Sequence, residues 1–292
     1  VVLRTTACGK SGLGVELALR FGGEIVSADS RQVYRGLDLG TGKITPQEMR
    51  GVPHHMLDVA EPNDPYSVAQ FQRGAYGAID GILSRGKLPF LVGGTGLYLR
   101  AVTEGFVFTG TSPDPALRSS LEDKTAPELY ALYQAQTGRT LTGGEEHNRH
   151  RLIRTLEKLS AGEEGPPPPC PRYDCLLLGV SYPREVVCQR IDERLQRRLD
   201  GGMVEEVAAL RANGASDAFL EGLGLEYRWI YRFLTGQLPD RAALVDELGR
   251  AIKRFAKRQV MWFKRDRDVL WLDMAGDPGA QAAQAIGAFL AR

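Results

Sequence analysis

Ala7-Cys8-Gly9-Lys10-Ser11 ends in the Gly-Lys-Ser signature of a loop that binds phosphate. The stretch lies between the apolar start Val1-Val2-Leu3 and residues 10–21, whose apolar side chains have helical spacing. In a loop between a strand and a helix, backbone amides and the lysine can hold a diphosphate. The hydroxyl of Ser11 can then ligate Mg²⁺, which we expect as the cofactor.

Arg4 departs from the general pattern of such loops. The pattern Gly-x-x-x-x-Gly-Lys-Ser has glycine at this position, where a small residue lets backbone amides approach an anion. Gly-Lys-Ser alone also occurs in plain strand-to-helix turns that carry a solvated lysine. On this motif alone both interpretations stay open.

Asp29 ends the next apolar run, residues 24–29, and Gly93-Gly94-Thr95 follows another, residues 88–92. Doubly wound sheets bind ligands outside the carboxyl ends of their strands, so Asp29 should face the same crevice as the phosphates. A lysine for a leaving diphosphate and a carboxylate for an incoming nucleophile indicate group transfer. The alternatives are a helix cap at Asp29 and a tight glycine turn. ATP chemistry would need a second carboxylate after an apolar strand. Asp58 is only a weak candidate for this carboxylate, so the sequence disfavours ATP chemistry.

Short apolar runs alternate with helical patterns, which is typical of an α/β fold with a parallel sheet. We expect strands at 1–3, 24–29, 88–92, 175–180 and 269–272, and helices at 10–21, 67–85, 185–199, 204–212, 227–234 and 241–263, before a closing helix. Residues 111–172 instead have mainly helical spacing and contain a proline run typical of a linker. The predicted organisation is a core of residues 1–110 plus 173–292 with a helical insertion domain at 111–172.

The composition is that of an ordinary globular protein, with 292 residues of which 43% are hydrophobic and 25% charged. A net charge of +1 gives no general attraction to nucleic acid or membrane, so any site for a polyanion must be local. The 4 cysteines have neither Cys-x-x-Cys nor zinc-finger spacing. With no apolar run of membrane-spanning length, we expect a cytoplasmic protein with reduced thiols and no membrane partner.

Ordered motifs through nearly the whole chain resemble those of the bacterial tRNA dimethylallyltransferases, also called tRNA isopentenyltransferases. These motifs occupy residues 29–43, 53–58, 66–71, 92–98, 114–118, 151–157, 189–194 and 256–263. The resemblance implies a P-loop NTPase-like sheet and transfer of a dimethylallyl group from dimethylallyl diphosphate to N6 of the adenosine just 3′ of the tRNA anticodon. The implied partners are dimethylallyl diphosphate and the tRNA anticodon stem-loop, and we expect a monomer.

The resemblance also implies roles for single residues. Asp29 matches the family's general base, needed because an exocyclic amine sheds a proton as it attacks. Arg194 and Thr6 match groups beside the leaving diphosphate, and Thr95 matches a residue that contacts tRNA at the reaction centre. By spacing alone Arg194 would belong to a solvated, arginine-rich helix face. The expected diphosphate-binding residues are Thr6, Ala7, Cys8, Gly9, Lys10 and Ser11.

Residues 250–267 are the expected RNA-binding segment, because lysine and arginine are concentrated there. The alternative is a solvated amphipathic helix, since apolar residues also recur at helical spacing. Chemistry on a base requires taking it out of its stack, so we expect the target adenine in a pocket floored by Asp29. The tRNA-binding residues that the motifs imply are Asp29, Ser30, Arg31, Gln32, Thr95, Arg118, His150, Arg151, Arg154, Tyr227, Arg228, Lys257, Arg258, Gln259 and Trp262.

The chain departs from the family pattern at Arg4, Thr5, Cys8, Asn148 and in residues 225–227, where Leu-Glu-Tyr replaces an apolar-Gly-Tyr turn. The first three departures bear on the affinity for diphosphate. Three other functions are considered: a P-loop kinase of small molecules, an adenylate isopentenyltransferase that uses free AMP, and a noncatalytic RNA-binding protein. The basic segment and the insertion argue against free AMP as the acceptor.

Overall fold

The computed structural model describes residues 1–3, 8–110, 112–141, 144–163, 167–264, 268–274 and 276–292. The chain divides into two compact units. The larger comprises Val1–Glu104 and Arg172–Arg292, and the smaller comprises Gly105–Pro171. The loop residues Thr6 and Ala7, together with Arg4 and Thr5, lie outside the described residues.

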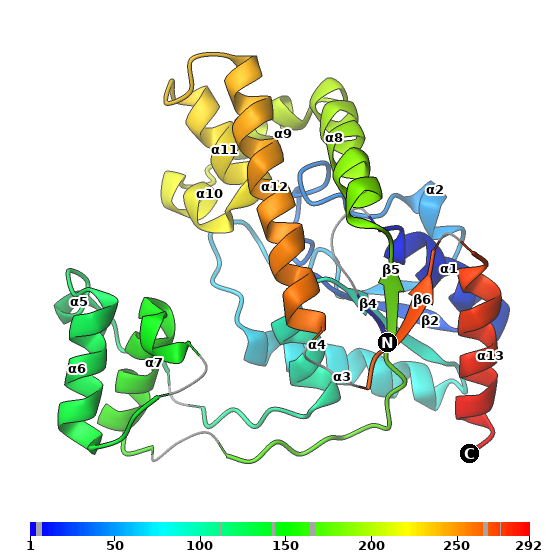
Figure 1. Ribbon diagram of the computed structural model, residues 1–292, viewed down its shortest axis with the longest axis horizontal. Coiled ribbons are helices and arrows are strands. Elements are labelled where there is room, and N and C mark those ends of the chain that lie inside the picture. The colour runs from blue at the N-terminus through cyan, green and yellow to red at the C-terminus, as the bar shows by residue number, and fades with distance from the viewer. Residues whose placement is uncertain (4–7, 111, 142–143, 164–166, 265–267, 275) are drawn as a thin grey trace. The chain divides into compact units, whose positions relative to one another are not determined.

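A parallel sheet forms the centre of the larger unit (Figure 1). Within the described part of the chain it has six strands in the order β3-β2-β4-β1-β5-β6. All its pairings are parallel. The strands are β1 (Val2–Leu3), β2 (Glu24–Ala28), β3 (His54–His55), β4 (Pro89–Gly93), β5 (Leu178–Ser181) and β6 (Leu270–Asp273). The predicted parallel α/β sheet is therefore confirmed.

Strand β2 is buried along its whole length, as expected when helices cover both faces of a parallel sheet. Because side chains alternate between faces, Val26 and Ala28 contribute to one hydrophobic cluster and Ile25 to another. Helices α1 (Lys10–Phe21) and α13 (Pro278–Leu290) lie side by side (Figure 1) and contribute to the second cluster. The larger first cluster extends over the helices within residues 68–103 and 184–263.

The helices predicted for the larger unit are observed with small shifts at their ends, whereas the short helices at 46–49, 96–103 and 217–223 were not predicted. A capping box between Ser67 and Gln70 starts α3, so Ser67 itself is the cap rather than the first helical residue. The helices are α1 (Lys10–Phe21), α2 (Pro46–Met49), α3 (Val68–Ser84), α4 (Gly96–Thr103), α8 (Arg184–Asp200), α9 (Met203–Ala212), α10 (Asp217–Leu223), α11 (Leu225–Leu234), α12 (Arg241–Phe263) and α13 (Pro278–Leu290).

The smaller unit has its own hydrophobic core. It is built from α5 (Pro115–Ser120), α6 (Ala126–Thr137), the 3₁₀ helix η1 (Glu145–His147) and α7 (Arg149–Ser160). Its core includes Leu129, Leu152 and Leu156, all of which are buried. The chain enters and leaves this unit at neighbouring points, since the Cys170 N–H donates to the Gly105 carbonyl at 2.8 Å.

Candidate active site

A pocket lies at the carboxyl ends of β2 and β4, beside the start of α1. It is partly open to solvent. Its lining contains the lysine and serine of the expected phosphate loop and the aspartate that follows β2. The lining residues are Lys10, Ser11, Ile25, Ser27, Asp29, Gln32, Ile44, His54, Val92 and Gly93. Two groups that the sequence predicted to act together, Lys10 and Asp29, therefore face the same space.

The first turn of α1 is suited to an anion. The helix begins at Lys10, and neither a side-chain cap nor an acidic residue occupies its first turn. The N–H groups of that turn have no partners within the helix, and the helix dipole adds partial positive charge there. The plain-turn interpretation with a solvated lysine does not describe this loop, because Lys10 is half-buried and lines the pocket.

Lys10 belongs to a cluster of charges. Burial lowers the pKa of its ammonium group, the negative charge of Asp29 opposes that shift, and the positive charges of Arg194 and Arg198 add to it. Three cations and one carboxylate therefore lie within electrostatic range of one another. Such crowding of positive charge is relieved when a polyanion binds.

Asp29 comes directly after β2, and no helix begins behind it, so it is not a helix cap. Its Oδ1 accepts a hydrogen bond from the Arg31 N–H at 2.9 Å. Thr95 lies on the adjoining turn after β4, where its Oγ1 accepts from the Ser30 N–H at 3.0 Å. Its own N–H donates to the Ala28 carbonyl at 3.2 Å. These bonds orient the carboxylate and fix the two strand ends to each other.

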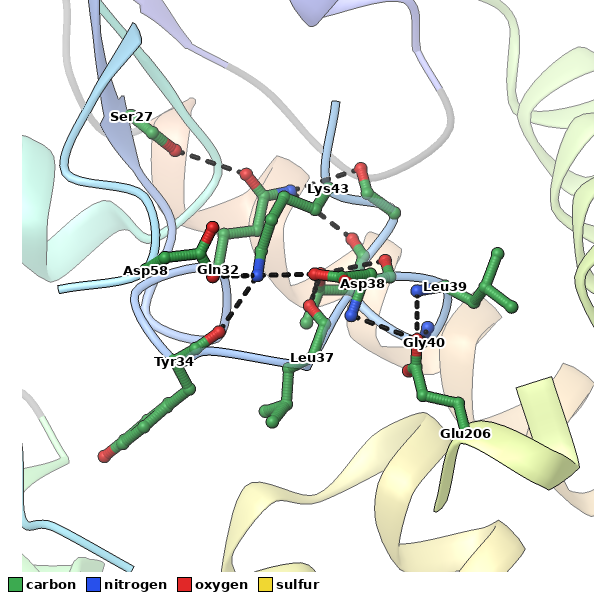
Figure 2. A network of polar contacts seen from close by, with 12 residues as sticks. Ser27, Gln32, Tyr34, Leu37, Asp38, Leu39, Gly40, Lys43, Asp58 and Glu206 are labelled. Carbon is green, nitrogen blue, oxygen red and sulfur yellow. Dashed lines mark hydrogen bonds and ion pairs between the residues drawn. The ribbon is translucent and has the colours of Figure 1, made fainter. Parts of the chain in front are cut away.

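Gln32 connects the pocket to the neighbouring loop. Its Oε1 accepts from the Ser27 hydroxyl at 3.2 Å, and its Nε2 donates to the carbonyls of Thr41 and Gly42 at 3.4 and 3.3 Å. We call residues 38–43 the 38–43 loop. Figure 2 shows this loop with Gln32 on one side and Glu206 on the other.

Glu206 of α9 anchors the 38–43 loop from outside the sheet. Its Oε2 accepts from the N–H groups of Asp38 and Leu39, at 3.1 and 2.6 Å. Its Oε1 accepts from the Gly40 N–H at 3.0 Å and from the Tyr227 hydroxyl at 2.9 Å. The carboxylate thus fills a nest of backbone amides, which holds the loop in one conformation (Figure 2).

Lys43 secures the other end of the loop. Its side chain is 7% exposed, and the ammonium donates to the Tyr34 carbonyl at 2.9 Å and contacts Asp38 and Asp58 at 2.6 and 2.5 Å. Asp58, a weak candidate for a second acid, is therefore engaged with this lysine. The 38–43 loop is thus held by hydrogen bonds to Glu206 and by the ion pairs of Lys43.

Arg194 lies on the side of α8 that faces this cluster and is half-buried. Burial lowers its pKa to about 10, the charge of Arg198 adds to the shift, and Glu226 of α11 opposes it. Arg197, between them in sequence, is exposed. The interpretation of a solvated helix face thus holds for Arg197 and fails for Arg194.

Several of the expected tRNA-binding residues have structural partners. Arg118 and Arg154 both contact Glu157, which is 1% exposed, at 2.6 and 3.0 Å. Tyr227 is 2% exposed and donates its hydroxyl to Glu206, so it packs against the 38–43 loop rather than presenting a surface. Gln259 is buried and donates to the Gly94 carbonyl at 2.8 Å.

The remaining expected tRNA-binding residues differ in exposure. His150, Arg151, Lys257 and Arg258 are exposed. Ser30, Arg31 and Gln32 are half-buried beside Asp29, and Arg228 donates to the Glu221 carbonyl at 2.8 Å. Trp262 lies beside Gly96, with the Arg100 guanidinium 5.9 Å from its ring centroid.

His54 is a pocket residue for which the motif gave no role. Its Nδ1 lies 2.8 Å from the Val52 carbonyl, and burial lowers its pKa. The neutral ring that donates from Nδ1 keeps an Nε2 lone pair as an acceptor. Glu206, Arg198 and Glu226 were likewise assigned no role, because each acts on a loop or helix far away in the sequence.

The residues present fit Mg²⁺ bound together with a diphosphate. In the described part of the chain no group of three or more His, Cys, Asp or Glu side chains could hold a metal ion alone. Mg²⁺ often keeps several waters and binds through few protein oxygens plus substrate phosphates. Ser11 supplies such an oxygen from the lining of the pocket.

Residues 32–266 match the family model described as IPP transferase. The chain belongs to the IPP transferase family. The tRNA dimethylallyltransferase 1 of Geotalea daltonii is 43% identical over 97% of this chain and 92% of its own length. A tRNA dimethylallyltransferase of Thermomicrobium roseum is 42% identical over 94% of this chain and 85% of its own. These names confirm the predicted enzyme class, and a kinase or a noncatalytic RNA-binding protein is not favoured.

Solved structures of this family share the fold. The full-length tRNA isopentenylpyrophosphate transferase of Bacillus halodurans matches with a TM-score of 0.74 and 34% identity, covering 99% of this chain and 94% of its own. A eukaryotic dimethylallyltransferase acting on tRNA matches in fold, with a TM-score of 0.79 and 24% identity over 98% of this chain. The predicted P-loop NTPase-like fold with a helical insertion is thereby confirmed. Among the helices that the structure describes, none has the length and apolar character to span a membrane.

Proposed function

We propose that this protein transfers a dimethylallyl group from dimethylallyl diphosphate to N6 of the adenosine just 3′ of the tRNA anticodon, with release of diphosphate. The observation that carries the proposal is the single pocket lined by Lys10, Ser11 and Asp29. The names of the relatives support this donor and acceptor. The protein acts on one tRNA at a time as a monomer.

In the reaction, the new N6–C bond forms as the C–O bond to the diphosphate breaks. The diphosphate leaves with the bonding electron pair, and the amine proton passes to the carboxylate of Asp29. The hydrogen bond from the Arg31 N–H to Oδ1 orients this carboxylate. Among the contacts that the structure describes, none engages Oδ2, so this oxygen is suited to accept the proton.

Lys10, the N–H groups at the start of α1 and Arg194 stabilise the negative charge that develops on the leaving diphosphate. These groups are preorganised, so they need little rearrangement as the C–O bond breaks. Thr6 is proposed to donate a further hydrogen bond there, with Ala7, Cys8 and Gly9 supplying loop backbone. Bound Mg²⁺ would neutralise part of the diphosphate charge.

The adenine enters from the side of the turns that follow β2 and β4. Ser30, Arg31, Gln32 and Thr95 surround Asp29 there and are proposed to contact the extruded nucleotide. The exposed basic side chains of α12, Lys257 and Arg258, are proposed to bind backbone phosphates. His150 and Arg151 of the smaller unit are proposed to do the same.

The direct test incubates the protein with tRNA, dimethylallyl diphosphate and Mg²⁺, followed by digestion to nucleosides and mass spectrometry. We expect one adenosine per tRNA to gain a dimethylallyl group, and a tRNA with another base at that position to stay unmodified. A parallel reaction with labelled ATP should show no consumption. ATP turnover without nucleoside modification would support the kinase instead.

A further inference from the structure

Arg198 is a largely buried guanidinium with few and long contacts. It lies one helical turn beyond Arg194 on α8, and its side chain is 16% exposed. Its Nη1 donates to the Gly40 carbonyl at 3.4 Å and lies 3.8 Å from Oε1 of Glu226. A guanidinium has five N–H donors, and burial of a charge is costly unless those donors are used. Within the described residues the donor capacity of Arg198 is thus poorly satisfied.

The 38–43 loop holds this guanidinium close to the pocket. Gly42 has a positive φ of 62°, and a side chain there would start 1.6 Å from Nη2 of Arg198, so the guanidinium would have to move. The carbonyl of the same Gly42 accepts from Gln32, which lines the pocket. One loop residue therefore separates Arg198 from the pocket lining.

Glu226 provides the internal negative charge for this region. Its side chain is 12% exposed, and burial raises its pKa, whereas the charges of Arg198 and then Arg194 oppose that shift. The charge of Asp29 reaches it as well and raises the pKa further. Glu226 thus lies among the same groups that surround Lys10.

We propose that Arg198 is a second guanidinium for the leaving diphosphate, and that Glu226 is the counter-ion that holds it until the diphosphate binds. This inference rests on the proposed function, because it assumes that diphosphate is the anion of the pocket. A diphosphate offers several charged oxygens to a planar fork of donors, whereas Glu226 offers one contact at 3.8 Å. Arg198 exchanges the weak internal contact for charge-assisted hydrogen bonds to the ligand.

The test is calorimetric titration of inorganic diphosphate, with Mg²⁺, into the purified full chain. We expect Arg198→Met to raise Kd about tenfold, as loss of charge-assisted hydrogen bonds does. Glu226→Gln removes the competing carboxylate and should lower Kd several-fold. In the Arg198→Met background the gain from Glu226→Gln should shrink, because the two residues act on each other.

Arg197→Met is the matched control, since it removes the same charge from the exposed side of the same helix and should leave Kd unchanged. Thermal unfolding of each variant checks the fold, and Arg198→Lys, which keeps the charge without the fork, should bind with intermediate affinity. Unchanged binding by Arg198→Met and Arg198→Lys, or weaker binding by Glu226→Gln, would overturn the inference. Diphosphate binding is measured without tRNA, so it does not depend on prenyl transfer. If the variants show the expected changes in Kd but the wild-type protein transfers no prenyl group, only the proposed function is refuted.

Discussion

Asp29 and Lys10 carry opposite charges and line the same pocket, yet the proposed chemistry requires them to act on different ends of the reaction. The carboxylate accepts a proton from the nucleophile, and the ammonium stabilises the leaving group. The charge of Asp29 also opposes the lowering of the Lys10 pKa by burial. The pocket therefore assigns proton acceptance and stabilisation of the leaving group to two different side chains.

The role of Asp29 predicts the effect of a nearly isosteric change. Asp29→Asn keeps the shape and the acceptor for the Arg31 N–H but cannot take up the proton. We expect prenyl transfer to slow by roughly 10²- to 10⁴-fold, the range of general-base catalysis, while tRNA binding persists. Single-turnover assays and a tRNA binding assay measure the two effects separately. Asp123→Asn, at an exposed position, is the control, and equal rates for both variants would refute the assignment.

Among the elements, the 38–43 loop depends on a helix far away in the sequence. Glu206 accepts from three consecutive N–H groups of this loop, 166 residues away at Gly40. Its Oε1 also binds Tyr227, which is why that tyrosine is buried. The loop in turn supports Gln32 in the pocket and leaves room for Arg198. Helix α9 therefore shapes the pocket without lining it.

Glu206→Gln tests this support. The glutamine amide has one accepting oxygen and a donating NH₂ group in place of the second oxygen. Either the N–H groups of Asp38 and Leu39 or the N–H of Gly40 would therefore face a donor. We expect the free energy of unfolding to fall by about 1 to 2 kcal/mol, because partly exposed amides lose hydrogen bonds to a charged acceptor. Amides 38–40 should also exchange hydrogen faster. The neighbouring exposed Glu205→Gln is the control, and equal exchange rates in the two variants would contradict the anchoring role.

Glu24 performs a structural task at the opposite, amino end of β2. Its carboxylate contacts His55, Arg85 and Lys87 at 2.7, 2.7 and 3.0 Å, which ties β2 to β3 and to the segment before β4. The hydrogen bond with His55 lowers the pKa of Glu24 most, and burial opposes this shift. Hydrogen bonds with Arg85 and Lys87 lower the pKa further, to about 2. The cluster joins three elements through one carboxylate.

This shift predicts how stability depends on pH. Because the folded pKa of Glu24 lies below its ordinary value of 4.5, its contribution is fully present above that pH and is lost as pH falls toward 2. We expect Glu24→Gln to unfold more easily at neutral pH and to lose less further stability between pH 5 and pH 2 than the wild type, measured by urea unfolding. Glu61→Gln, which breaks an exposed ion pair with Arg35, should follow the wild-type curve.

The two units of the chain have separate hydrophobic cores. The chain passes between them at Gly105 and Cys170, where a side chain at residue 105 would start 1.8 Å from the Cys170 carbonyl oxygen. Glycine at this position allows the two backbones to meet and hydrogen-bond. The insertion therefore interrupts the larger unit at a point where its two ends are already close.

This arrangement predicts that the insertion can be removed. Replacing residues 106–169 by a short glycine-serine linker should leave a folded larger unit that binds diphosphate with unchanged affinity. Affinity for tRNA should fall, because the exposed His150 and Arg151 are lost with the smaller unit. Circular dichroism, calorimetry and a tRNA binding assay measure these outcomes. If this linker variant binds tRNA as tightly as the full chain does, the insertion has no role in RNA binding.

Local patterns were sufficient to predict the parallel sheet, most helix positions and the meeting of Lys10 with Asp29. Alternation of apolar runs with helical spacing is a local property, and parallel strands bring their carboxyl ends to one edge of the sheet. Helix α12 was predicted with both ends as observed. Strand β3, only 2 residues long, was missed because so short a run has no periodicity.

Side-chain environments could not be derived in the same way. The spacing of arginines on α8 gives no sign that Arg194 and Arg198 are half-buried while Arg197 is exposed, because burial depends on which elements pack against the helix. Equally, nothing near Glu206 in the sequence points to the 38–43 loop. Strand β1 and helix α1 follow from patterns among residues that are neighbours in the sequence. The charged groups around the pocket come together only when α8, α9 and α11 pack together, since electrostatic partners are set by distance in space.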